Sequence, residues 1–148
     1  MGVATIVNSP SSIQSAVDLA QPGTILLPEN PEKKLRISVS LLTCEGDVIA
    51  LASGVWNLTN RILIETERLT IRSVTGDPKD VILDFGWQEA NGFKVSASNV
   101  TIAGITVMKT GYHGVQVQPA QTIVGTVIYN MHFIDSGNQF IKVKQKWI

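Results

Sequence analysis

The sequence predicts an all-β parallel β-helix, a solenoid in which short strands stack coil upon coil. The first observation is a short apolar segment that returns at intervals of 22 to 31 residues, at positions 62–64, 93–95, 115–117 and 141–143. The second is a further strand signal ahead of the last two segments, at 100–107 and 127–133. Self-similarity at this period indicates a solenoid, and repeats built of strands without helices indicate a β-helix.

The N-terminal residues predict a short capping helix. Residues 11–20 place Ile13, Ala16, Val17 and Ala20 on one helical face, after a proline and two serines that can cap the first turn. The Gln-Pro-Gly sequence at 21–23 ends the helix, and residues 24–27 are typical of a strand. A helix followed by a strand suits the first coil, because the open end of a solenoid must be covered.

Residues 28–45 interrupt the repeat. Residues 28–34 are charged and contain two prolines, which is typical of an exposed loop, and residues 35–42 fit either a strand or a helical turn. A glycine turn then leads into a strand at 48–51, so either this segment or the N-terminal helix could cover the end. We expect one domain over residues 1–148, with a cap region and irregular loop at 1–45 and coils at 46–148.

The remaining coils are expected to contain strands near 62–64, 69–72, 81–84, 93–95, 100–102, 105–107, 115–117, 127–133 and 141–143. These segments are rich in Val, Ile and Thr and are separated by Gly, Asn, Asp and Pro turn signals. A shift of 26 residues aligns Ile102, Ile105, Val107 and Val115 with Ile128, Met131, Phe133 and Ile141. We expect these residues to form the columns of the core. The same shift aligns Lys109 with Asp135, an expected surface ion pair between coils about 4.8 Å apart.

The composition excludes several classes of protein. The chain has 148 residues, long enough for a buried core, and its 12 basic and 12 acidic side chains balance, so neither nucleic acid nor a membrane surface is expected as a partner. No apolar run approaches the roughly 18 residues of a membrane span, and residues 1–27 lack the pattern of a signal peptide. Cys44 is the single cysteine and is expected to be a small buried hydrophobic residue.

Three segments carry a resemblance to a known family. Residues 14–27 (QSAVDLAQPGTILL), 46–58 (GDVIALASGVWNL) and 95–107 (VSASNVTIAGITV) resemble right-handed parallel β-helix proteins of the pectate-lyase-like superfamily, and the similarity extends through Lys144. The resemblance implies a right-handed solenoid, and an extracellular or periplasmic location. That superfamily includes polysaccharide lyases, hydrolases, epimerases, phage tailspikes and proteins without assigned activity, so the fold alone does not select an activity.

A polar column is the first candidate site. The middle residues of three aligned segments are Lys94, Gln116 and Lys142, which should point outward on one sheet with the two lysines about 10 Å apart. In the resembling family the groove along such a sheet holds an acidic polysaccharide, and lysines suit its carboxylates. The alternative is that outward positions of a sheet are simply polar.

A histidine and a tryptophan are further candidates. His113 follows Tyr112 in a glycine-bounded corner and aligns with Asn91 and Gln139, so it fits either a general base or a polar ladder of turn residues. Of the three tryptophans, Trp56, Trp87 and Trp147, Trp87 in a corner loop is the best candidate for stacking on a sugar; the alternative is that it packs at the rim of the solenoid.

Acidic side chains give little support to a metal site. Lyases of the resembling superfamily that use calcium gather carboxylates from successive coils, and calcium takes six to eight oxygen ligands. Here Asp80, Asp84 and Glu89 lie mostly on one coil and align with no acid on the next two. We therefore expect neither a metal nor a cofactor. Asn57 and Asn99 begin glycosylation sequons, although Asn99 fits a corner turn better.

Four to five coils are expected, with no evident cap after the last one. Either further coils follow in a longer protein, or the open end is an oligomer interface; we expect a homodimer with Phe140, Trp147 and Ile148 in the contact. The function that fits best is a non-catalytic carbohydrate-associated or structural module. The alternative is a polysaccharide lyase or epimerase acting on acidic polysaccharides through Lys94, Lys142 or His113.

Overall fold

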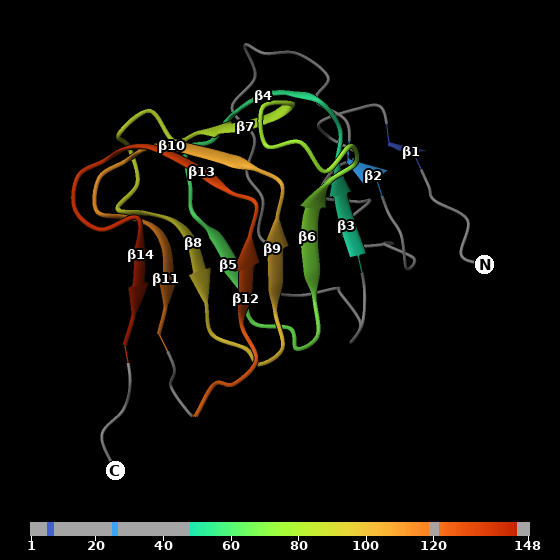
Figure 1. Cartoon of the computed structure of the whole chain (residues 1–148). Helices are drawn as coiled ribbons and strands as arrows, with labels where there is room; N and C mark the ends of the chain where they lie inside the picture. Colours follow the sequence, from blue (N-terminus) through green and yellow to red (C-terminus); the bar gives the residue numbers. More distant parts are fainter. Residues whose placement is uncertain (1–5, 8–24, 27–47, 119–121, 145–148) are drawn as a thin grey trace.

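The computed structural model describes residues 6–7, 25–26, 48–118 and 122–144, and this part of the chain is all-β (Figure 1). The predicted capping helix, the ambiguous segment at 35–42 and Cys44 lie outside the described residues. Two short strands, β1 (Ile6–Val7) and β2 (Ile25–Leu26), precede the coils. The strand expected at 24–27 is confirmed by β2, whereas β1 has no counterpart in the sequence prediction.

The other twelve described strands form four coils of three strands each, which confirms the predicted parallel β-solenoid. The first coil contains β3 (Val48–Leu51), β4 (Gly54–Asn57) and β5 (Ile62–Ile64). The second contains β6 (Thr70–Ser73), β7 (Val81–Asp84) and β8 (Asn91–Val95). The third contains β9 (Thr101–Ala103), β10 (Thr106–Thr110) and β11 (His113–Val117). The fourth contains β12 (Val127–Tyr129), β13 (His132–Ser136) and β14 (Ile141–Val143).

Three parallel sheets run along the solenoid. The first has the order β1-β2-β3-β6-β9-β12, the second β4-β7-β10-β13 and the third β5-β8-β11-β14. Figure 1 shows the three rows of arrows, with β14, β11, β8 and β5 side by side in one of them. Each strand therefore hydrogen-bonds to the equivalent strands of the coils before and after it.

The register of the third sheet confirms the alignment made from the sequence. Phe93 pairs with Ile62 on one side and with Val115 on the other, and Val115 pairs with Ile141. The shift of 26 residues is confirmed in the other two sheets, where Ile102 pairs with Ile128 and Val107 with Phe133. The side chains of these columns are fully buried in the second and third coils, for example Phe93, Ile102, Val107 and Val115. Burial of one such side chain contributes about 1.5–3 kcal/mol.

Two strand boundaries differ from the prediction. The segment at 127–133 is two strands rather than one, because Asn130 adopts a left-handed backbone with φ of 49° and turns the chain between β12 and β13. Strand β4 was not predicted, since Ser53-Gly54 reads as the end of a strand. In the structure Gly54 itself begins β4, and its φ of 147° is open to glycine more than to other residues.

Candidate functional site

The predicted polar column is present in the third sheet. Lys94 pairs with Leu63 and with Gln116, and Gln116 pairs with Lys142. Both lysines are half-buried and lie between inward-facing apolar neighbours, which places them on the outer face of the sheet. Gln116 is only 8% exposed, because it lies between the two lysines, and its Nε2 donates a 3.0 Å hydrogen bond to Oε1 of Gln118.

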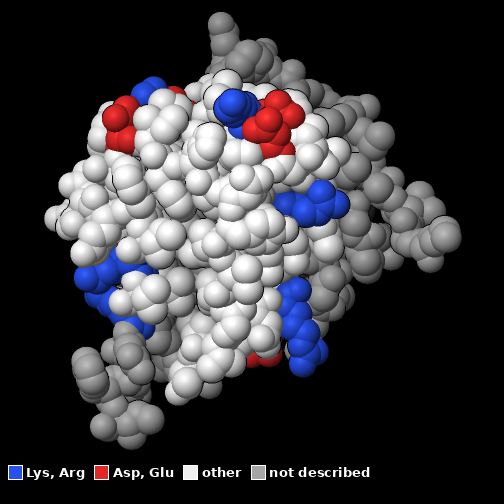
Figure 2. Space-filling model, in the orientation of Figure 1, with Lys and Arg blue, Asp and Glu red and all other residues white. Residues whose placement is uncertain are grey.

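Positive charge gathers toward the last coil on this face. Two residues beyond the lysine column, the outward residues of successive coils are Glu65, Ser96, Gln118 and Lys144. The acid therefore lies on the first coil and Lys144 on the last, about 14 Å apart by strand spacing. Figure 2 shows Lys and Arg atoms at the edge near β14, while the middle of the face in view is largely uncharged.

His113 belongs to a buried polar ladder. It pairs in register with Asn91, as the alignment predicted, and its Nδ1 lies 3.3 Å from the carbonyl oxygen of Gln139 on the next coil. Because a carbonyl only accepts, Nδ1 carries the proton in the neutral ring. The ring also meets that of Tyr112 edge-on, at 5.9 Å between centroids. Asn91 is buried, and its Oδ1 has no hydrogen-bond partner among the described residues.

The two described tryptophans differ in exposure. Trp87 is 53% exposed in the corner between β7 and β8, and its backbone N–H donates to the carbonyl oxygen of Lys109 at 2.8 Å. Trp56 is buried in the core, and its Nε1 donates to the carbonyl oxygen of Ala52 at 3.2 Å. A surface role for Trp56 is therefore excluded, and Trp147 lies outside the described residues.

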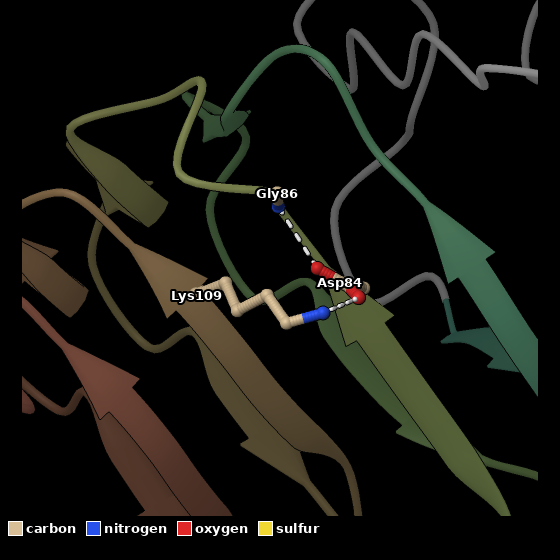
Figure 3. Close-up of polar contacts among 3 residues, drawn as sticks. All are labelled: Asp84, Gly86 and Lys109. Carbon is tan, nitrogen blue, oxygen red and sulfur yellow. Dashed lines mark hydrogen bonds and ion pairs between the residues drawn. The ribbon is translucent and has the colours of Figure 1, made fainter.

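Lys109 and Asp135 occupy equivalent positions on adjacent coils, as the alignment predicted, but the expected ion pair between them is not formed. Nζ of Lys109 instead lies 2.7 Å from Oδ2 of Asp84 on the preceding coil, while Oδ1 of Asp84 accepts from the backbone N–H of Gly86 at 2.9 Å (Figure 3). The Asp84 carboxylate thus accepts from both the lysine and a backbone N–H, whereas Asp135 is exposed on the last coil.

Carboxylates and imidazoles do not gather in the described part of the chain. Within these residues no three His, Cys, Asp or Glu side chains come together as a metal site would need, so Asp80, Asp84 and Glu89 are not brought into one. The described residues also include no helix long and apolar enough to cross a membrane.

The last coil leaves part of the core uncovered. Ile141 is 43% exposed and Val143 66%, although their partners Val115 and Val117 on the preceding coil are buried. The ladder bonds on both sides of these residues run from Val115 N to Phe140 O and from Lys144 N to Val117 O. The N–H and C=O groups of Ile141 and Val143 therefore face away from the third coil, as at a sheet edge. Phe140 is also exposed and stacks on Phe133, while Trp147 and Ile148 lie outside the described residues.

One exposed aromatic residue was missed as a candidate. Tyr112 is 58% exposed at the corner between β10 and β11, one coil beyond Trp87. Its position within a glycine-bounded turn indicated exposure, but it was considered only as the neighbour of His113. Comparison with family models, with curated proteins and with solved structures finds no match to this chain.

Proposed function

We propose that this chain is a short or truncated member of the pectate-lyase-like superfamily that binds acidic polysaccharide without chemical turnover. The observation that carries the proposal is the column in which Lys94 and Lys142 flank Gln116 on the outer face of the third sheet. Two ammonium groups two coils apart, about 10 Å, suit a polymer that presents carboxylates at intervals.

The surroundings of the column support anion binding. The lysine stems are half-buried, so part of their conformational freedom is already lost before a ligand arrives. Lys144 adds a third positive charge on the same face, while Glu65 lies on the first coil, away from the lysines of the last. A uronate polymer would meet two or three cations here and an amide from Gln116 or Gln118.

The absence of turnover is proposed because two groups suited to proton transfer, Asp84 and His113, are already engaged. The carboxylate of Asp84 is bound by Lys109 and by the N–H of Gly86. The imidazole of His113 is buried, with Nδ1 against the carbonyl oxygen of Gln139. A lyase or epimerase that uses Lys94, Lys142 or His113 is the alternative.

Binding to polygalacturonate, alginate and chondroitin sulfate tests the proposal, by isothermal titration with and without calcium. Each exposed charge contact contributes up to about 1 kcal/mol. We expect K94Q/K142Q to weaken binding about tenfold or more, and added salt to weaken wild-type binding. Lys79→Gln, an exposed lysine on another loop, is the matched control.

Two results would contradict this function. Equal binding by wild type and K94Q/K142Q would remove the lysine column from recognition. Release of unsaturated uronate, followed by its ultraviolet absorbance, would identify a lyase and refute the absence of turnover. Loss of that product in Lys94→Ala, Lys142→Ala or His113→Ala would then locate the catalytic group.

We also propose that the open C-terminal end self-associates into a dimer. The exposed Ile141 and Val143 and the unpaired strand edge of β14 favour this role, since a second copy would cover both. Light scattering on a sizing column should give a dimer for the wild type and a monomer for I141S/V143S. An unchanged oligomer in that variant and in W147S/I148S would refute the interface.

A further inference from the structure

We infer that an acidic oligosaccharide bound at the lysine column runs along the strand direction and stacks a second sugar ring on Trp87 and Tyr112. The inference rests on the proposed function, because the lysine column supplies the anionic end of the site. It adds a second subsite of different chemistry and an orientation for the ligand.

Trp87 and Tyr112 lie at the same corner of the solenoid on adjacent coils. Trp87 lies between β7 and β8, and Tyr112 between β10 and β11, so both precede strands of the sheet that carries the lysines. Backbone bonds join the two corners: Trp87 N donates to Lys109 O, and Tyr112 N donates to Ala90 O. With more than half of each side chain exposed, the two rings offer aromatic surface to solvent on consecutive coils.

The backbone of Trp87 gives an independent indication. Its φ is 62°, in the left-handed region that disfavours every residue with a Cβ and bulky residues most. A tryptophan that is both strained and exposed contributes little to the stability of the fold at this position. Strain of this kind is concentrated at binding sites, where the surrounding structure holds it.

The distance between the two subsites selects the size of the ligand. Tyr112 immediately precedes β11 and lies four residues before Gln116, or about 13 Å for an extended chain at the usual rise per residue. Gly114 and its neighbour Gly92 on the preceding coil are buried between the corner and the lysine column, and an added Cβ would meet core side chains such as Phe133 and Val107, so these glycines face the core. A ligand that joins both subsites must therefore contain several sugar rings and run along the strand direction, across the solenoid axis.

Charge sets the direction of that ligand. At the aromatic end Asp84 and Lys109 neutralise each other, and Glu89 lies in the same corner as Trp87. An anionic group is repelled there and attracted to Lys94 and Lys142. The ring at the corner is thus held by its C–H face against an aromatic side chain, and the carboxylate lies at the lysines.

The test compares a galacturonate trimer with the galacturonate monomer by isothermal titration. Trp87→Ala and Tyr112→Ala should each weaken trimer binding about fivefold to tenfold and leave monomer binding within about twofold. Tyr129→Ala, an equally exposed tyrosine on the first sheet, is the matched control and should bind like the wild type. Bound trimer should also protect the exposed Trp87 from iodide quenching, and the protection should be absent in Trp87→Phe.

The outcomes separate this inference from the proposed function. If K94Q/K142Q loses the trimer while Trp87→Ala and Tyr112→Ala retain it, the inference is refuted and the proposed function stands. If the wild type binds neither polymer nor trimer, both are refuted. If the aromatic variants weaken monomer and trimer equally, the two-subsite arrangement is wrong. Unfolding midpoints within a few degrees of wild type establish that each variant is folded.

Discussion

Thr126 is expected to destabilise the solenoid, so that Thr126→Val should stabilise it. Register places Leu69, Val100 and Thr126 in one column, immediately before the paired residues of β6, β9 and β12. Leu69 and Val100 are fully buried. The Oγ1 atom of Thr126 is also buried and has no hydrogen-bond partner among the described residues. A hydroxyl therefore occupies a position where the preceding coils have hydrocarbon.

The magnitude follows from the cost of an unsatisfied polar group. A buried donor or acceptor without a partner costs about 1–3 kcal/mol, and valine has nearly the shape of threonine. Thr126 lies in the last coil and its residue as a whole is only half-buried, which favours the lower end of that range. We expect Thr126→Val to raise the free energy of unfolding by about 1 kcal/mol and the melting temperature by about 3 °C. Urea titration and calorimetry measure the two quantities.

Thr106→Val is the matched control with the opposite expected sign. Oγ1 of Thr106 donates a buried 2.6 Å hydrogen bond to the carbonyl oxygen of Pro78. The same substitution there removes a partner from a buried carbonyl and should cost about 1–2 kcal/mol. If Thr126→Val destabilises the protein as Thr106→Val does, the Thr126 hydroxyl has a partner and the reasoning is refuted.

Three further predictions test the contacts between coils, each by urea titration. Gly92→Ala would place a Cβ 2.6 Å from the carbonyl oxygen of Gly114 and should lower the free energy of unfolding by more than about 2 kcal/mol. Gly76→Ala is the control: its Cβ would have nothing within 4 Å, so it should lower that free energy only by the about 1–2 kcal/mol of a left-handed backbone. Equal costs would contradict the close approach. Lys109→Ala should change stability by less than about 1 kcal/mol, because its ion pair is partly exposed, and a larger loss would mean a buried network. Asn130, with φ of 49° and a hydrogen bond to Gly76 O, should tolerate Gly better than Ala, and the reverse order would contradict the left-handed corner.

The columns of the core could be predicted because aligning two apolar segments at one residue also aligns all their other residues. Side chains alternate with a period of two, so aligning one residue of a segment fixes which neighbours point inward. Val115 aligned with Ile141 therefore also placed Gln116 against Lys142, as the structure confirms. The lysine column was predictable for the same reason as the core beside it.

The corners were harder to predict, because each depends on one backbone angle. Gly54 was predicted to end a strand, whereas it begins β4. Neither β4 nor the burial of Trp56 within it was therefore predicted. Lys109 shows a second limit: it has an acid on the coil to either side, and the alignment does not say which one the side chain contacts. In the structure it contacts Asp84, whose other carboxylate oxygen accepts from the N–H of Gly86. A hydrophobic pattern predicts neither the start of β4 nor the acid that Lys109 contacts.

Trp87 is the bulkiest of the described non-glycine residues with a left-handed backbone. Asn99, Asn130 and Asp135 also have positive φ, and Asn and Asp tolerate that region through local hydrogen bonds, whereas Arg68 and Lys109 share it without that preference. If the tryptophan is there for binding, Trp87→Gly should raise the unfolding free energy by about 1 kcal/mol through relief of strain, while binding of the galacturonate trimer is lost. Asn99→Gly, the control, should gain less. A Trp87→Gly variant that loses stability would instead mean that the indole packs for the fold, because strain without a functional gain must be offset by contacts.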